Sequence, residues 1–258
     1  YPPVSDSKSP VVSDLSPPEK GGGFTNLDIW SYYDRNTPIT AKLIRYPDGS
    51  SEALISRALP VDTSHEHTPK GQGSTDHSPR NILRAKSLLR KKLKSAKMCY
   101  MLTLTTRANI KGYRETQAMV TKFLRKLRSN YDGVKYLGVP ERQKRGAWHW
   151  HFAVDQRLDV NLIRKLWQSL TGGKGSGSIN IQPKTPKELT YLAKYMTKDS
   201  DKVPSGCKRY LGSQNIKIDE EKTTHDNLSD FLQQFHAEYQ TFTGEHFITD
   251  NGSIWIKS

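Results

Sequence analysis

The middle of the chain carries two alternating patterns of hydrophobic and polar residues. Apolar residues three or four positions apart predict amphipathic helices, over residues 82–97, 115–129, 160–171 and 185–198. Short runs with β-branched or aromatic residues predict strands, over residues 98–105, 134–139, 147–154 and 178–182. Asp159 can cap the third helix, and Thr185 and Glu188 have capping-box spacing at the start of the fourth.

From residue 98 onward, the order of these elements is β-α-β-β-α-β, followed by one extra helix. This order is that of the ferredoxin-like split βαβ arrangement, which RRM domains also adopt, and it predicts an α+β fold. We expect an antiparallel sheet with the two crossover helices on one face. The opposite face is then left for a ligand.

The flanking segments have a different composition. Residues 1–80 are expected to be an N-terminal extension and linker, partly flexible, with Pro-, Ser- and Gly-rich stretches and a short hairpin closed near Pro47-Asp48-Gly49. Residues 81–215 are expected to form the main domain. Residues 216–258 are expected to add a helix and a hairpin turning at Asp250-Asn251-Gly252, packed on that same domain.

Composition narrows the set of partners. The chain has a formal net charge of +14, and residues 80–145 hold 19 Lys and Arg against 3 Asp and Glu. Such a concentration favours a nucleic-acid backbone over a solvated helix surface or an anionic membrane. No apolar run is long enough to cross a bilayer. Two cysteines are too few for a disulfide framework, and residues 1–20 lack a signal-peptide core, so we expect a cytoplasmic protein.

A histidine pair provides the strongest candidate chemistry. In Trp148-His149-Trp150-His151-Phe152, the two histidines share one face of a strand and the aromatic residues share the other. Two imidazoles at this spacing can converge on one divalent ion, although two surface histidines would produce the same pattern. Glu141, just past the preceding strand, can supply a third ligand or be an ordinary hairpin residue. A site with one Glu and two His ligands suits Mg²⁺ or Mn²⁺ rather than a closed zinc site.

The last predicted helix carries two tyrosines. Tyr191 and Tyr195 are four residues apart and share one helix face, which Lys194 and Lys198 flank. Tyrosine can act as a covalent nucleophile. Taken alone, an amphipathic helix whose tyrosines pack on the sheet explains the pattern equally well.

Together these motifs resemble the HUH endonucleases, in particular the rolling-circle replication initiators (Rep proteins) of bacterial plasmids and small single-stranded-DNA phages. Three motifs occur in the family's order over about residues 95–215: the strand Leu102–Thr105, the His149-Trp150-His151 strand with Glu141 upstream, and Tyr191-Leu192-Ala193-Lys194-Tyr195. The last is similar to the two-tyrosine YxxKY version. The family's HUH fold is the split βαβ arrangement.

The resemblance implies a mechanism and its residues. Glu141, His149 and His151 would hold the metal, Tyr191 would form a 5′-phosphotyrosine link, Tyr195 would serve the second transfer, and Lys194 would stabilise charge. The DNA contacts implied for the same sheet face and its basic hairpin fall on six residues: Thr103, Thr105, Arg142, Lys144, Arg145 and Lys198. The implied partners are single-stranded DNA at a replication origin, often a hairpin, and a helicase and polymerase of the bacterial host.

Three alternatives remain. A two-tyrosine transposase or a relaxase would use the same chemistry on other DNA ends, although relaxases usually carry a third histidine that is not placed here. A repressor built on the same sheet would bind DNA without cleaving it. An RNA-binding RRM would place aromatic residues on the strand face, where this chain places histidines.

Overall fold

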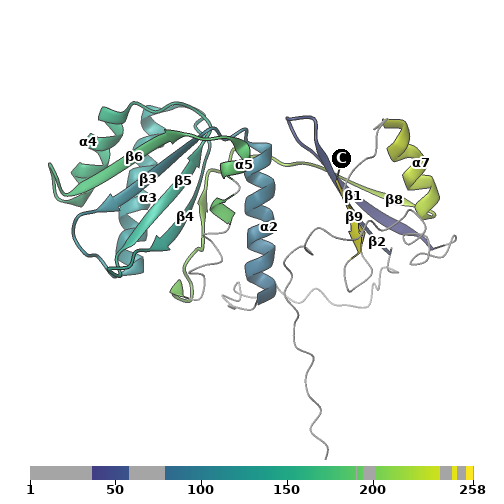
Figure 1. Cartoon of the computed structure of the whole chain (residues 1–258), viewed down its shortest axis with the longest axis horizontal. Helices are drawn as coiled ribbons and strands as arrows, with labels where there is room; N and C mark the ends of the chain where they lie inside the picture. The colour runs from purple at the N-terminus through teal and green to yellow at the C-terminus, as the bar shows by residue number, and fades with distance from the viewer. Residues whose placement is uncertain are drawn as a thin grey trace, which may run out of the picture.

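Two antiparallel sheets contain all the described strands in the computed structural model (Figure 1). The structure describes residues 37–57, 79–189, 191–193, 202–238, 246–248 and 254–257. Within these ranges the protein is a mixed α+β structure. No helix in these ranges is long and apolar enough to cross a membrane.

The first sheet has the predicted connectivity. Its elements are β3 (Tyr100–Thr106), α3 (Tyr113–Asn130), β4 (Tyr136–Arg142), β5 (Trp148–Val154), α4 (Val160–Thr171) and β6 (Gly177–Pro183). The strand order is β6-β3-β5-β4-β7, where β7 (Leu211–Gly212) is a short edge strand that the sequence did not predict. The β-α-β-β-α-β prediction and the ferredoxin-like α+β fold class are therefore confirmed.

One face of this sheet buries the aromatic core against α3 and α4. Trp150 and Phe152 of β5 point to this face and pack with Phe123 of α3 and Trp167 of α4. Gly138 on β4 is required here, because a Cβ atom at this position would lie 2.0 Å from the ring of Phe152. The predicted caps also form: the Asp159 carboxylate accepts the Leu162 amide, and Gly172 ends α4 with a φ of 115°.

The opposite face is only partly open. Helix α2 (Pro79–Ser95) places Leu89 and Leu93 against Leu137, Val139 and Ala153 of this face. The short helix α5 (Pro186–Leu189) and the helical residues 192–193 after it add Leu189, Leu192 and Ala193 to the same cluster. The face predicted to be free for a ligand is therefore partly covered, and Glu141, His149 and Thr103 are not part of the cluster that covers it.

The second sheet joins segments from both ends of the chain. Its order is β8-β1-β2-β10-β9, with β1 (Ile39–Arg45), β2 (Ser51–Arg57), β8 (Asp219–His225), β9 (His246–Ile248) and β10 (Ile254–Lys257). The predicted β1–β2 hairpin turns at Gly49, whose φ is 86°. Helix α7 (Leu228–Glu238) packs Leu228 and Phe231 on the apolar face of this sheet.

This pairing corrects the expected place of the C-terminal segment. Residues 216–258 were expected to pack on the domain of residues 81–215, but β8 pairs with β1 and β10 pairs with β2. The physical reason lies in β1, whose buried Ile39 and Ala41 need neighbours on both sides, while its cations match the acidic β8. Lys42 pairs with Glu220 at 2.6 Å, and Arg45 pairs with Glu221 at 2.8 Å.

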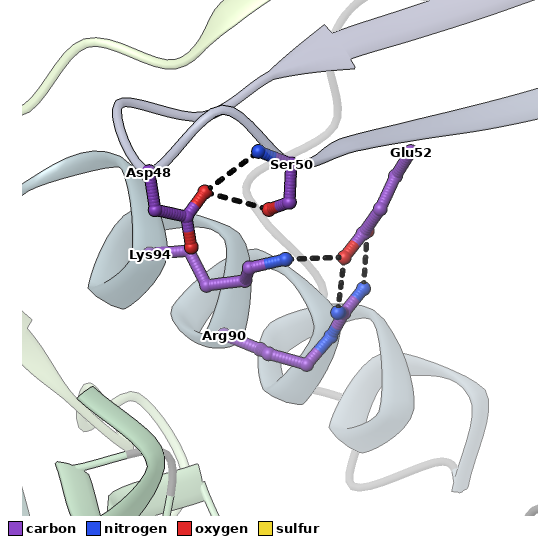
Figure 2. Close-up of polar contacts among 5 residues, drawn as sticks. All are labelled: Asp48, Ser50, Glu52, Arg90 and Lys94. Atoms are coloured by element: carbon purple, nitrogen blue, oxygen red, sulfur yellow. Dashed lines mark hydrogen bonds and ion pairs between the residues drawn. The ribbon is translucent and has the colours of Figure 1, made fainter. Parts of the chain in front are cut away.

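Helix α2 joins the two sheets (Figure 1). On the side away from the first sheet, Arg90 donates to both carboxylate oxygens of Glu52 on β2, at 2.5 and 2.6 Å (Figure 2). Lys94 lies 3.4 Å from the same carboxylate, and its ammonium stands 3.9 Å from the centre of the Tyr46 ring. Part of the basic charge of residues 80–145 is therefore used inside the protein rather than on a partner.

Candidate metal centre

The sheet register places Glu141 directly beside the histidines. Strand β4 continues to Arg142 rather than ending at residue 139, so Glu141 pairs with His149 and Val139 pairs with His151. Because alternate residues of paired strands share a face, all three polar side chains point away from the aromatic core. The sequence placed Glu141 just past the strand, and the structure places it within the ladder.

Three ligand atoms converge at this point. The Glu141 Oε2 atom lies 2.8 Å from His149 Nε2 and 2.9 Å from His151 Nε2. The three ligand atoms all lie within 4.8 Å of one another, and the imidazole ring centres are 4.5 Å apart. This is the only group of three or more such side chains found in the described part of the chain. The predicted ligand set is thus brought together.

The arrangement has two chemical states. Without a cation, each imidazole must carry its proton on Nε2 to donate to the shared carboxylate oxygen. With a divalent cation, both Nε2 lone pairs and the carboxylate can turn to the ion, and the two protons leave these atoms. One carboxylate and two imidazoles form a donor set that a divalent metal can use, with further coordination positions left for water or substrate.

Two further side chains contact the outer nitrogens of the imidazoles. The Thr103 hydroxyl lies 3.1 Å from His151 Nδ1, and the Gln143 amide nitrogen lies 3.4 Å from His149 Nδ1. A partner on Nδ1 fixes ring orientation and tautomer. Thr103 was predicted as a DNA contact, and here it orients a ligand. Gln143 was missed; the only signal in the sequence is its place two residues after Glu141 in the tight hairpin.

Aromatic packing on the opposite face of the sheet fixes the position of the histidine strand. Trp148 and Trp150 are buried on the opposite face, where the Tyr113 ring meets the Trp148 ring edge-on at 4.9 Å. Thr105, another predicted DNA contact, is half-buried, and its carbonyl accepts the Trp167 indole N–H at 2.9 Å. The histidine strand is therefore held from behind by aromatic side chains.

The β4–β5 hairpin carries the predicted basic residues beside the cluster. Arg142 and Lys144 are exposed, and Gly146 turns the chain with a φ of 89°. Arg145 is exposed too, but its guanidinium donates to the Arg107 carbonyl at 2.8 Å, to the Gln143 side chain at 2.8 Å and to the Thr106 carbonyl. It fastens the hairpin to the end of β3, and so has a structural role whatever else it contacts.

The tyrosine segment begins as predicted. The Thr185 backbone N–H donates to the Glu188 carboxylate at 2.8 Å, and the Glu188 N–H donates to the Thr185 hydroxyl at 3.3 Å, which completes the capping box. Leu192 and Ala193 are buried against the histidine face of the first sheet, while Tyr191 is 56% exposed. Lys194, Tyr195 and Lys198 lie outside the described residues.

Comparison with known proteins gives one family match. Residues 99–200 match the family of the replication-associated protein ORF2/G2P, a range that includes the three ligands and the whole tyrosine segment. This match supports a replication initiator family. No curated protein matches. The crystal structure of the hypothetical protein ORF119 from Sulfolobus islandicus rod-shaped virus 1 is 18% identical, with 43% of this chain and 94% of that chain covered and a TM-score of 0.31.

Proposed function

We propose that this protein initiates rolling-circle replication by nicking and rejoining single-stranded DNA, with Tyr191 as nucleophile and a Mg²⁺ or Mn²⁺ ion as cofactor. The observation that carries the proposal is the convergence of Glu141, His149 and His151 on one point of the sheet face opposite the aromatic core. A domain that only bound DNA would have no use for this ligand set. The match of residues 99–200 to replication-associated proteins supports the same activity.

The proposed reaction exchanges one phosphodiester for another. The Tyr191 oxygen attacks the scissile phosphorus and loses its proton, the bond to the 3′ oxygen breaks, and that oxygen takes up a proton. The products are a 5′-phosphotyrosine and a free 3′-hydroxyl that a polymerase can extend. A divalent cation bound by the three ligands would polarise the scissile phosphate. Tyr195 would attack a second phosphate to release and join the displaced strand, and Lys194 would stabilise the charge that develops.

The position of Tyr191 supports its role as nucleophile. Its neighbours Leu192 and Ala193 are buried in the cluster that contains Val139 and Ala153, which belong to the same sheet face as the ligands. Tyr191 itself is more than half exposed. The segment is thus fixed to the histidine face while its first tyrosine stays accessible to a DNA strand.

The exposed cations of the β4–β5 hairpin match the negative charge of a DNA backbone. We propose that Arg142 and Lys144 on the hairpin contact the DNA backbone near the metal centre, together with Arg145, Thr105 and Lys198. The substrate would be single-stranded DNA at a replication origin, presented on or beside a hairpin. A host helicase would unwind the duplex and a host polymerase would extend the 3′ end. A transposase or relaxase would carry out the same chemistry. A preference for origin DNA over the ends of mobile elements would distinguish a replication initiator from either of them.

A covalent-adduct assay tests the proposal. The protein is mixed with a pool of single-stranded DNA and Mn²⁺ and run on a denaturing gel. We expect an adduct that EDTA prevents and that Tyr191→Phe reduces, with the Tyr191→Phe/Tyr195→Phe double variant forming none. Tyr100→Phe, on the opposite face of β3, is the matched control and should retain the adduct.

Two outcomes would contradict the proposal. Tight binding of single-stranded DNA with no adduct for any sequence would favour the repressor function. An adduct that survives in the double variant would mean that another side chain is the nucleophile.

A further inference from the structure

A cavity of about 560 Å³ lies at the edge of the first sheet, away from the metal centre. Its walls come from α3, from the side of α2 near the edge, and from residues 204–214, which run past the edge strand β7. This volume falls in the range of small-molecule and cofactor sites. No step of the proposed nicking reaction uses it.

The cavity has fixed walls. The Tyr113 hydroxyl donates to the Lys208 carbonyl at 2.7 Å, and Arg114 donates to the Ser205 carbonyl at 3.1 Å, so that α3 holds the segment 204–208 at two points. Beyond β7, the Ser213 amide donates to the Tyr136 carbonyl at 3.0 Å, and the Ser213 hydroxyl accepts the Tyr136 amide at 3.2 Å. The segment is therefore tied to α3 and to β4 at both of its ends.

The charge of the lining has one sign. Four cationic residues line the cavity, and its lining, all of it within the described ranges, includes no Asp or Glu: the cations are Lys92, Arg128, Lys208 and Arg209. Arg128 also donates to the hydroxyl of Tyr136, which holds its guanidinium at the wall. A cavity lining that holds several cations and no Asp or Glu favours an anionic ligand, and a guanidinium suits a phosphate in particular.

The uncharged part of the lining combines polar residues such as Thr121, Ser205 and Gln214 with apolar and aromatic ones. Tyr210 is half-buried, and burial raises the pKa of its hydroxyl. Leu124 and Leu211 also contribute to the lining. A tyrosine ring beside aliphatic side chains offers a stacking surface for a nucleobase, which phosphate alone would not need. The lining thus combines a phosphate site with a surface for a flat apolar ring.

We propose that this cavity binds one nucleotide of the single-stranded DNA, with a backbone phosphate against the four cations and the base against Tyr210. That the bound strand is single-stranded DNA rests on the proposed function. The cavity adds a second DNA contact, which takes no part in the nicking reaction. Tyr136 and Glu141 are five residues apart on β4, and at a rise of about 3.3 Å per residue this spans roughly 17 Å. A strand with a rise of about 3.4 Å per nucleotide would cover that distance in about five nucleotides.

The consequence is a length-dependent affinity. An oligonucleotide confined to the metal centre would not reach the cavity, whereas one extended by about ten nucleotides on either side would occupy both sites. The extra contact would hold the strand at a fixed distance from the scissile phosphate and so help to select where the strand is cut.

Fluorescence anisotropy with short and extended labelled oligonucleotides tests this directly. We expect the extended strand to bind more tightly to the unmodified protein. Arg128→Gln and Lys208→Gln should each remove most of that gain and lower the slope of log K against log salt by about 0.7. Tyr210→Leu keeps the apolar packing and should weaken binding of the extended strand at least about fivefold. Lys165→Gln, an exposed cation on α4, is the charge-matched control and should leave the gain intact.

The outcomes of this experiment distinguish a failure of the cavity proposal from a failure of the proposed nicking activity. Equal affinities of the pocket variants and Lys165→Gln for the extended strand would overturn it, even if adduct formation on the short oligonucleotide were normal. A deoxynucleoside monophosphate or triphosphate that binds alone, is weakened by the pocket variants and leaves no length-dependent gain would also overturn it in favour of a free nucleotide. A pocket-dependent gain would support it whether or not an adduct forms.

Discussion

Glu52 and Glu141 are two carboxylates that each lie between a pair of nitrogen-bearing side chains, but their partners differ in kind. Glu52 is 1% exposed and is bound by Arg90 and Lys94 (Figure 2). Glu141 lies between His149 and His151. Arginine and lysine keep their protons and offer no lone pair near neutral pH, whereas neutral imidazole does. The first cluster is therefore closed to a cation and the second is open to one.

The type of nitrogen beside the carboxylate therefore determines whether such a cluster can accept a metal cation. The Glu52 cluster joins α2 to β2, beside a hairpin turn in which Asp48 accepts from the amide and hydroxyl of Ser50 (Figure 2). The Glu52 cluster therefore attaches α2 to the second sheet. The Glu141 cluster joins two strands that the backbone ladder already pairs, so its side chains are not needed for that pairing.

Removing Glu141 should have the largest effect, a loss of metal binding with little change in stability. Glu141→Gln keeps the size of the side chain but removes the charge that a divalent cation needs. We expect Mn²⁺ binding, measured by calorimetry, and adduct formation to fall by more than about 100-fold, because a ligand matters at least as much as its supporting partners. The melting temperature should change little, and a Glu141→Gln protein that still bound Mn²⁺ normally would remove this carboxylate from the site.

Removing Glu52 should do the opposite: it should lower the stability of the fold and leave Mn²⁺ binding unchanged. Glu52→Ala leaves Arg90 and Lys94 partly buried without their carboxylate, which costs about 3 kcal/mol of unfolding free energy, at the lower end of the usual range because both cations keep some exposure. Urea unfolding measures this loss. Glu221→Ala, which breaks an ion pair whose carboxylate is 51% exposed, should cost less than about 1 kcal/mol. Similar losses for both variants would mean that the buried pair has no special role.

Acid should weaken the Glu52 cluster. Burial by itself would raise the pKa of Glu52, but the hydrogen bonds and charges of Arg90 and Lys94 outweigh it and lower that pKa below its usual value. The folded state therefore binds this proton less readily than the unfolded state. The stability from Glu52 is present above its ordinary pKa of about 4.5 and is lost as pH falls through the lower folded value. Melting curves from pH 7 down to about 3 should show this loss, and Glu52→Gln should lack that part of it.

The sequence predicted the first sheet well because local and long-range signals agree there. Alternation along Trp148–Val154 places aromatic residues on one face and histidines on the other, and the caps at Asp159 and Thr185 fix the ends of two helices. Once the order β-α-β-β-α-β was established, the neighbours of each strand followed from the known connectivity. The ligand set followed in turn from two paired strands.

The second sheet could not be predicted in the same way. Strand β8 has the sequence Asp219–His225 with mostly exposed polar residues, so no hydrophobic pattern marks it as a strand. Its pairing with β1, far away in the sequence, depends on complementary charges such as Lys42 with Glu220. The role of Arg90 and Lys94 was missed for the same reason. A basic helix looks identical in sequence whether its cations face DNA or a buried carboxylate.

The smallest effect should come from the residues that contact the Nδ1 atoms of the two imidazoles. Thr103→Val keeps the shape of the side chain but removes the hydroxyl that lies 3.1 Å from His151 Nδ1. With a cation on Nε2, the Nδ1 atom carries the proton and would lose its acceptor, so we expect Mn²⁺ affinity to fall about tenfold with an unchanged melting temperature. Gln143→Ala removes the longer contact of 3.4 Å to His149 and should lower the Mn²⁺ affinity by a smaller factor.

Glu52→Ala is the control, because it should lower stability and leave the Mn²⁺ affinity unchanged. Calorimetry on these three variants therefore distinguishes a side chain that orients a metal ligand from one that only stabilises the fold. Equal affinities for Thr103→Val and the unmodified protein would mean that the strands alone orient His151.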